Sequence, residues 1–280
     1  MKKLLVLIAI FSLVMIGCGK DDKANTPDGT TVTTDGKLKG EVRIAGGTAH
    51  IPIWEKVAEV LKKENPDLKI TIQAGGSGAG IKQAGEGLVD IGNSGRDLKE
   101  SEIKDFGLVP YKIAIDGIAV IVNPKSGVEN LTLEQVQKIF AGEIKKWSEV
   151  GGADEDINIY TRGPESGTRK TFESLALKGS KIAESANLAT SNGNMKVLAA
   201  GDEQAIGYMS VGYLDDTVKP LSVDGVAPTL ENVKSGAYKI QRFLYSCTKG
   251  EAKGLAKVLI DYVQSEEGQK IVVEKGFLTP

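Results

Sequence analysis

Hydrophobic and polar residues follow two different periods along the first half of the chain. Short stretches that alternate at every second position predict strands. Between the first two stretches, the apolar positions from Trp54 to Leu61 lie three and four residues apart, which predicts one buried face of a helix that ends at Asn65-Pro66. The predicted strands cover residues 41–45, 68–73 and 88–94.

The second half repeats this order of strand, loop and helix. A strongly apolar strand at 113–123 stops at Pro124, and Thr132 with Gln135 forms a capping box at the start of a helix. Alternating strands and helices predict an α/β fold with mostly parallel sheets and helices on both faces, where ligands bind at the carboxyl ends of the strands. Further strands are expected at 157–161, 205–210 and 242–247, before two closing helices.

The N-terminus has the pattern of a secretory signal. Lys2 and Lys3 precede an apolar run of 13 residues, which is shorter than the roughly 20 residues of a spanning helix. Residues 14–18 resemble a lipoprotein signal box, in which cleavage precedes a cysteine that then receives a lipid. We therefore predict a signal peptide at 1–17 and a lipid anchor on Cys18. The alternative is an ordinary secretory signal with an incidental cysteine.

Residues 18–40 differ in composition from the rest of the chain, which predicts a tether followed by a folded body. Residues 18–40 are rich in Asp, Lys, Thr and Gly, which predicts a flexible tether. The body that follows has about 240 residues, enough for two lobes. Without residues 1–17 the chain carries 33 basic and 37 acidic residues and shows no basic stripe with interleaved aromatics, which argues against nucleic acid as a partner. Cys247 lies in an apolar run and is expected to be a buried structural thiol.

Residues 73–84, QAGGSGAGIKQA, indicate an anion-binding loop. Glycines and a serine directly before a helix-forming run provide backbone amides that bind anions at a helix N-terminus. Gly75 and Gly80 have the spacing of a Walker loop, but Ile81 intervenes before Lys82 and no hydroxyl follows. The glycines are also out of register with a dinucleotide fingerprint. Both nucleotide interpretations are therefore excluded.

The loop at residues 162–169, RGPESGTR, indicates a second anion-binding element. Arg162 offers a planar fork to two oxygens of a tetrahedral anion. Ser166, Gly167 and Thr168 stand where a helix begins, with hydroxyls and amides that have no partner within the helix. The alternative is a helix cap beside a surface arginine.

Four such loops end predicted strands, at Thr48-Ala49, Ser77, Ser94 and residues 162–169. With these loops the body resembles the phosphate-binding proteins that serve high-affinity phosphate ABC transporters and have the type 2 periplasmic binding protein fold. The motif Arg162-x-x-x-Ser166-Gly167-Thr168 is the most specific part of the resemblance. The other motifs are GGSGAGIKQA, DIGNSGR, IAIDGIAVIVNP, LTLEQVQKIFAGEIKKW, AIGYMSVGYL and SEEGQKIVVEKGF.

The resemblance implies that free orthophosphate binds between two lobes, which two crossover strands join near residues 113–120 and 241–247. It implies a monomer outside the cytoplasm that delivers phosphate to the permease subunits of an ABC transporter, without catalysis, metal or cofactor. Lobe 1 is expected at 41–117 with 246–280, and lobe 2 at 118–245. The phosphate ligands are expected to be Thr48, Ala49, Ser77, Ser94, Gly95, Arg162, Ser166, Gly167 and Thr168.

One position departs from the family. Well-known members have an aspartate where Gly95 stands, and its carboxylate accepts the proton of hydrogen phosphate and so repels sulfate. Other branches of the family have a small residue followed by arginine at this point. Arg96 is expected either to supply charge there or to have a supporting or surface role. Receptors for sulfate, molybdate or tungstate therefore stay open as alternatives, as does a phosphate sensor or adhesin without transport.

Catalysis is a weaker interpretation of the same residues. A secreted phosphatase needs a nucleophile with a base or a metal cluster, and His50 is the only histidine in the sequence. We expect His50 to line a loop or start a helix. Asp116 and Glu165 flank the expected cleft, where they are expected to orient an arginine or a crossover strand rather than transfer protons.

Overall fold

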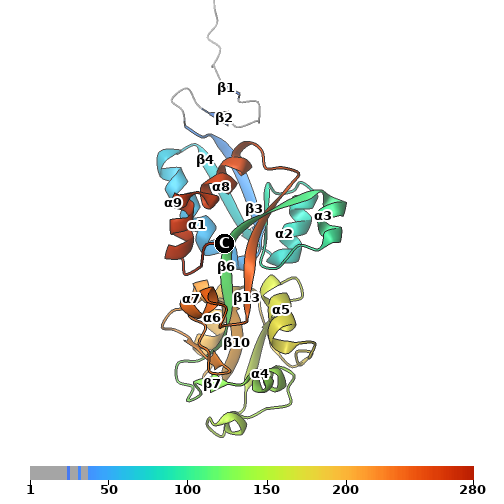
Figure 1. Ribbon diagram of the computed structural model, residues 1–280, viewed down its shortest axis with the longest axis vertical. Helices are drawn as coiled ribbons and strands as arrows, with labels where there is room; N and C mark the ends of the chain where they lie inside the picture. The colour runs from blue at the N-terminus through green and yellow to red at the C-terminus, as the bar shows by residue number, and fades with distance from the viewer. Residues whose placement is uncertain (1–23, 26–30, 33–36) are drawn as a thin grey trace, which may run out of the picture.

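The computed structural model describes residues 24–25, 31–32 and 37–280. Two lobes lie one above the other along the longest axis, and strands β6 (Leu108–Val122) and β13 (Gln241–Lys249) run from one lobe into the other (Figure 1). This arrangement agrees with the predicted α/β fold of two lobes with two crossover strands.

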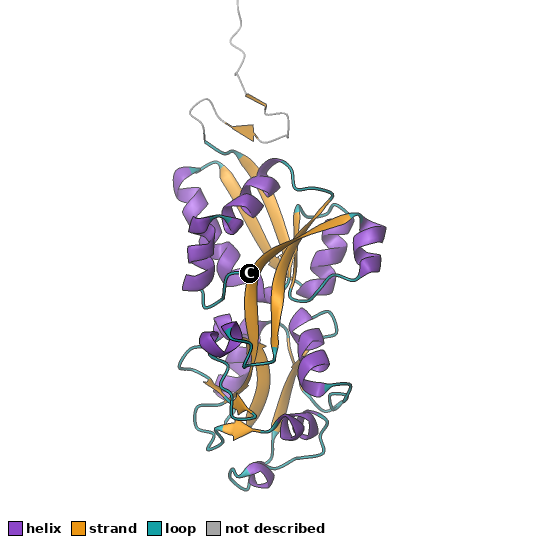
Figure 2. Cartoon of the chain, in the orientation of Figure 1, coloured by secondary structure: helices purple, strands orange, loops and turns teal. Residues whose placement is uncertain are grey.

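The first lobe has a twisted sheet with helices on both faces (Figure 2). Its strands are β3 (Gly40–Gly46), β4 (Leu68–Ala74) and β5 (Ile91–Ser94), and β3 pairs in parallel with both of its neighbours. One face packs on α1 (Ile51–Glu64), α8 (Gly254–Gln264) and α9 (Glu266–Glu274). The other face packs on α2 (Gly76–Gly85), and α3 (Glu100–Phe106) lies beside it.

The second lobe repeats this plan with β8 (Asn158–Arg162), β9 (Asn187–Ala189) and β10 (Ala205–Ser210), where β8 pairs in parallel with both neighbours. Short strands β7 (Asn130–Leu131) and β12 (Ser222–Val223) pair beside the sheet, and β11 (Lys219–Pro220) pairs with β6. Its helices are α4 (Leu133–Phe140), α5 (Gly167–Phe172), α6 (Asn192–Gly201) and α7 (Leu230–Lys234).

The crossover strands make the whole sheet mixed. β13 pairs antiparallel with β5 and β6, and β6 pairs antiparallel with β10. β10 contacts β6 only from Ile118 onward, and β5 contacts β13 only from Tyr245 onward. Between these points, around Asp116 and Arg242, the two strands are paired with each other, and we call this segment, which connects the lobes, the hinge.

Local sequence signals explain several element boundaries. The predicted capping box forms at α4, where the Gln135 amide donates to Thr132 Oγ1 at 3.1 Å and the Thr132 amide donates to Gln135 Oε1 at 2.8 Å. The glycine-rich run differs from the expectation of a loop followed by a helix, because α2 already begins at Gly76. Cys247 is buried beside α2, as predicted, and burial raises the pKa of its thiol to about 12.

Part of the predicted tether has described structure. Residues 24–25 pair antiparallel with residues 31–32. Leu38 packs against the first lobe, and its amide donates to Asn65 Oδ1 at 2.7 Å. The predicted signal peptide and Cys18 lie outside the described residues. Within the described part of the chain, no helix is long and apolar enough to cross a membrane.

Candidate anion-binding site

A small cavity of about 10 Å³ lies between the lobes, where the ends of several strands meet. The loops after β3, β4, β5 and β8 all reach it, as the sequence predicts for parallel sheets. Most predicted ligands line this cavity, and the lining also includes three residues that the sequence analysis did not select. The lining residues are Gly47, Thr48, Ala49, Gly76, Ser77, Gly95, Arg162, Ser166, Gly167, Thr168 and Arg242.

The Thr48 hydroxyl is oriented by donors from the second lobe. Thr48 and Ala49 belong to a 3₁₀ turn, Thr48–His50, and both are buried. Thr48 Oγ1 accepts from Asn192 Nδ2 at 3.0 Å, from the Asn192 amide at 3.3 Å and from Arg162 Nη2 at 3.4 Å. Because the oxygen accepts these bonds, the hydroxyl proton is directed to another acceptor. The Ala49 amide lies in the same first turn.

Ser77 is the second residue of α2 and is fully buried. Its Oγ accepts from the Gly95 amide at 2.9 Å, which leaves the hydroxyl proton free to donate. Gly76 precedes it with φ +83, a conformation that favours glycine, and a Cβ there would lie 2.7 Å from the carbonyl oxygen of Glu165. The glycines of this loop therefore allow the loop of the second lobe to approach closely.

Arg162 carries the clearest sign of a ligand site. It ends β8 and is only 2% exposed. Its Nε donates to the Ala189 carbonyl at 3.0 Å and its Nη2 to the Thr190 carbonyl at 3.3 Å. Its Nη1 is buried without a hydrogen-bond partner among the residues that the structure describes. Burial, with Arg242 nearby, lowers the pKa of Arg162 to about 10, so the guanidinium stays charged at neutral pH.

Burying a cationic donor that has no acceptor costs free energy. Arg162 Nη1 is therefore expected to donate to a bound anion.

The start of α5 faces the same cavity. Ser166 is the N-cap, and its Oγ accepts from the Arg169 amide at 3.2 Å. Gly167 and Thr168 are the first helical residues, whose amides have no carbonyl partner within the helix. α5 continues into a π-helical segment, Glu173–Leu177, so the first amides stand at the end of a longer helical stretch. The unpaired amides at the start of α5 and the dipole of the helical stretch both favour an anion at this end of the helix.

The loop after β5 differs in part from the prediction. Gly95 lines the cavity, but Ser94 and Arg96 do not. Ser94 Oγ donates to the Arg96 carbonyl at 2.7 Å, so it shapes the turn that points the Gly95 amide at Ser77. The Arg96 guanidinium pairs with Glu102 at 2.7 and 2.9 Å. This contact fits the expectation that Arg96 has a supporting or surface role.

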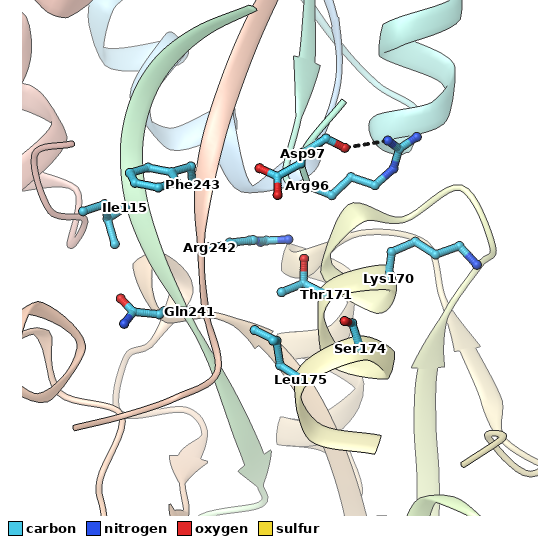
Figure 3. A pocket seen from close by; sticks show the side chains of 10 residues that line it. All are labelled: Arg96, Asp97, Ile115, Lys170, Thr171, Ser174, Leu175, Gln241, Arg242 and Phe243. Atoms are coloured by element: carbon cyan, nitrogen blue, oxygen red, sulfur yellow. Dashed lines mark hydrogen bonds between the residues drawn. The ribbon is translucent and has the colours of Figure 1, made fainter. Parts of the chain in front are cut away.

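Arg242 occupies the space beside Gly95 instead, and the sequence analysis missed it. It projects from β13 between the Arg96–Asp97 turn and Thr171 of α5 (Figure 3). Its Nη1 donates to the Gly95 carbonyl at 2.8 Å, and a Cβ on Gly95 would lie 2.7 Å from that nitrogen. The overlooked signal was a pair of opposite charges, Asp116 and Arg242, each next to apolar residues in one of the two predicted crossover strands.

Asp116 orients Arg242, and orienting an arginine is one of the two roles that the sequence analysis expects for Asp116. Its Oδ2 accepts from Arg242 Nε at 2.9 Å and from Nη2 at 2.7 Å. Its Oδ1 accepts from the Ser210 hydroxyl at 2.7 Å. Burial raises the pKa of Asp116, while Arg242 and Ser210 oppose that shift. Asp116 does not line the cavity itself.

His50 contacts the backbone of the loop that follows β3. It is fully buried, with Nδ1 3.2 Å from the Gly47 carbonyl and Nε2 3.1 Å from the Tyr245 carbonyl on β13. Burial lowers the pKa of His50 to about 3, with a smaller contribution from Arg242. The imidazole is therefore neutral at physiological pH. It lies outside the cavity lining, at the N-cap of α1, which fits the expectation that it lines a loop or starts a helix.

The lobes are closed against each other across the cavity. Tyr213 OH of the second lobe donates to the Thr48 carbonyl at 2.7 Å. The Gly78 amide donates to the Glu165 carbonyl at 3.2 Å, and Thr171 Oγ1 donates to the Gly95 carbonyl at 3.3 Å. These bonds join loops far apart in sequence, so the cavity exists only when the two lobes meet.

Comparison with known proteins agrees with this geometry. Residues 30–267 match the PBP superfamily domain. The chain is 41% identical over 278 residues to the phosphate-binding protein PstS of Bacillus subtilis, a match that covers 98% of this chain and 92% of the relative. The chain belongs to the phosphate-binding protein family. It is also 32% identical to the phosphate-binding protein PstS of Borreliella burgdorferi, over 99% of both chains.

Solved structures of phosphate-binding proteins share the fold. A crystal structure with bound phosphate, of a substrate-binding protein assigned to a phosphate ABC transporter of Clostridium perfringens, is 40% identical with a TM-score of 0.82. It matches 86% of this chain and 100% of that chain. An ABC-type phosphate transport receptor from Vibrio cholerae is 34% identical with a TM-score of 0.69, over 85% of this chain and 100% of that chain.

Members of the phosphate-binding protein family are solute-binding components of transporters, so this chain is a binding protein and not an enzyme. Within residues 37–280 and the two short paired segments, no group of three or more His, Cys, Asp or Glu side chains is arranged to hold a metal ion.

Proposed function

We propose that this chain captures inorganic phosphate between its two lobes and delivers it to the permease of an ABC transporter. The observation that carries the proposal is that Arg162 lines a cavity of hydroxyls and helix amides while its buried Nη1 has no partner among the described residues. A tetrahedral anion supplies the acceptors that this nitrogen, the Thr48 and Ser77 hydroxyls and the first amides of α5 need.

The number of donors is sufficient for tight binding. A hydrogen bond to a charged group contributes about 1.5 to 3 kcal/mol, and micromolar affinity requires about 8 kcal/mol. Arg162, the four hydroxyl groups of the lining and the amides of two helical turns exceed that requirement before desolvation is subtracted. No metal or cofactor is needed for this affinity.

Closure of the lobes around the anion explains how a transporter would recognise the loaded protein. We assign lobe 1 to residues 41–117 with 246–280 and lobe 2 to residues 118–245, hinged at β6 and β13. The bonds from Tyr213 to Thr48 and from Gly78 to Glu165 exist only in the closed arrangement. A permease that contacts both lobes would therefore distinguish the loaded protein from the empty one.

Isothermal titration calorimetry tests the proposal on the chain from Gly19 onward, which keeps every described residue. The protein is unfolded and refolded first, so that carried-over ligand is removed. Phosphate should bind at one site per chain with a dissociation constant of about 1 μM or lower. Absence of phosphate binding, in a protein that circular dichroism shows to be folded, would reject phosphate as the ligand.

Anchoring and localisation are part of the same proposal. We propose that the chain acts outside the cytoplasm as a monomer and that a lipid on Cys18 holds it at the membrane, with residues 18–40 as the tether. Mass spectrometry of the native protein should show a diacylglyceryl-modified N-terminal cysteine. A Cys18→Ala variant should lose membrane association in cell fractionation. Equal membrane association of the variant would contradict the lipid anchor.

A further inference from the structure

Three elements of the second lobe converge on Thr48, a residue of the first lobe. The Thr48 hydroxyl accepts from Arg162 Nη2, at the end of β8, and from Asn192, at the start of α6. The Thr48 carbonyl accepts from Tyr213 OH, in the 3₁₀ turn Val211–Tyr213. The second lobe therefore holds Thr48 both at its side chain and at its backbone.

Asn192 makes the closest of the contacts to the Thr48 hydroxyl. It is fully buried, and it directs two donors at Thr48 Oγ1, its side-chain Nδ2 at 3.0 Å and its backbone amide at 3.3 Å. The Ser210 amide donates to Asn192 Oδ1 at 3.1 Å. Because a backbone amide can only donate, the side-chain oxygen of Asn192 has to face Ser210, and the side-chain NH₂ group then faces Thr48.

These donors determine where the Thr48 proton is directed. Thr48 Oγ1 accepts from Asn192 and Arg162, so its own proton needs an acceptor elsewhere. Thr48 lines the anion cavity, whereas Asn192 does not. An anion in the cavity supplies the acceptor for this proton, and Asn192 acts on that anion through the Thr48 hydroxyl rather than by contact.

We propose that Asn192 is a positioning residue that makes the Thr48 hydroxyl a donor to the bound anion when the lobes close. The inference rests on the proposed phosphate function and adds a residue to that site. When the lobes separate, Asn192 and Arg162 move away with the second lobe, and Thr48 Oγ1 loses the donors that direct its proton. The hydroxyl can then rotate and bond to water as donor or acceptor. Lobe closure and phosphate binding therefore favour each other at this one hydroxyl.

A double-mutant cycle tests the inference, with phosphate affinity measured by calorimetry on the chain from Gly19 onward. Asn192→Ala should weaken phosphate binding about tenfold, because Thr48 loses its side-chain donor. Thr48→Val removes the hydroxyl, and in that background Asn192→Ala should change the affinity less than about twofold. An equal loss with and without the Thr48 hydroxyl, or no loss in Asn192→Ala, overturns the inference and leaves the phosphate function standing. Absence of phosphate binding by the unmodified chain rejects both.

A second pair of variants separates positioning from a purely structural role. Asn192→Asp keeps the side-chain shape and the oxygen that accepts from Ser210, but an ionised carboxylate cannot donate and accepts the Thr48 proton instead. Phosphate affinity should therefore fall at least about tenfold.

Asn194→Asp is the matched control for the added charge. It lies two residues further along α6 and keeps the oxygen that accepts from the Thr190 amide at 2.9 Å and from Thr190 Oγ1 at 3.3 Å. Because solvent and salt screen a charge at this half-buried position, phosphate affinity should change less than about threefold. Equal affinities in Asn192→Asp and Asn194→Asp overturn the inference, and this comparison decides it even where Asn192→Ala fails to fold.

Discussion

Asp116 and Arg242 are paired across the two crossover strands, and one carboxylate oxygen, Oδ2, accepts from both Nε and Nη2 of the arginine at 2.9 and 2.7 Å. Both side chains are buried in the hinge. The same arginine donates to the Gly95 carbonyl of the first lobe, and the same aspartate accepts from Ser210 of the second. The pair thus connects the hinge, both lobes and the wall of the anion cavity.

Removal of Asp116 should therefore destabilise the whole chain. An Asp116→Ala change leaves Arg242 buried without its counter-ion, and we expect the free energy of unfolding to fall by about 3 to 5 kcal/mol. Urea denaturation measures this change. Glu86→Ala is the control, because its pair with Lys82 spans 3.9 Å on the surface and should contribute less than about 1 kcal/mol. Equal losses for both variants would contradict the structural role of the hinge pair.

Arg162 should dominate anion affinity. Arg162→Lys keeps a positive charge but loses the planar fork and the buried Nη1, so phosphate affinity should fall about 10- to 100-fold. Calorimetry gives the dissociation constants. Arg43→Lys is a matched control on the surface of β3, where the arginine pairs with Asp90 at 3.6 Å. Unchanged affinity in Arg162→Lys would remove this arginine from the site.

Close approach of the lobes at Gly167 should also be required for binding. A Cβ at Gly167 would overlap Ser77 Oγ and lie 2.9 Å from the Gly95 carbonyl carbon, so Gly167→Ala should hold the lobes apart. We expect phosphate affinity to fall at least about tenfold, with the melting temperature of the ligand-free protein little changed. Gly163→Ala, in the same loop with open space around it, should bind normally. Tight binding by Gly167→Ala would show that closure does not require this contact.

Acid should destabilise the protein through His50. The folded pKa of about 3 lies below the ordinary 6.5, so the unfolded chain binds a proton that the folded chain does not. Stability from this residue is present above about pH 6.5 and is lost toward pH 3, by about 1.4 kcal/mol per pH unit. His50→Gln should show a shallower fall in the free energy of unfolding between about pH 7 and pH 5. Identical slopes for the two proteins would contradict the buried neutral state.

The sequence predicted most of the fold because its signals are local. The spacing from Trp54 to Leu61 and the Thr132 capping box correspond to α1 and α4 as observed. Positions that depend on pairing between distant strands were harder. Arg242 reaches the cavity only because β13 lies beside β6 with Asp116 as its partner, and sequence spacing does not give that register.

In the candidate site too, some residues could be predicted from the local sequence and others could not. Ser77 and Arg162 could be selected because each follows a strand with hydroxyls or glycines next to it. Ser94 was expected in the lining, but its hydroxyl is used by the Arg96 carbonyl two residues away. Such a local turn competes with ligand binding, and a pattern of small polar residues does not show which of the two occurs.

A crystal structure of the chain with phosphate tests the central claim most directly. The anion should lie between the lobes, with a phosphate oxygen about 2.8 Å from Arg162 Nη1 and further bonds from Thr48, Ser77 and the first amides of α5. Phosphate bound outside this cavity, or bound in it while Arg162 Nη1 keeps no acceptor, would contradict the account.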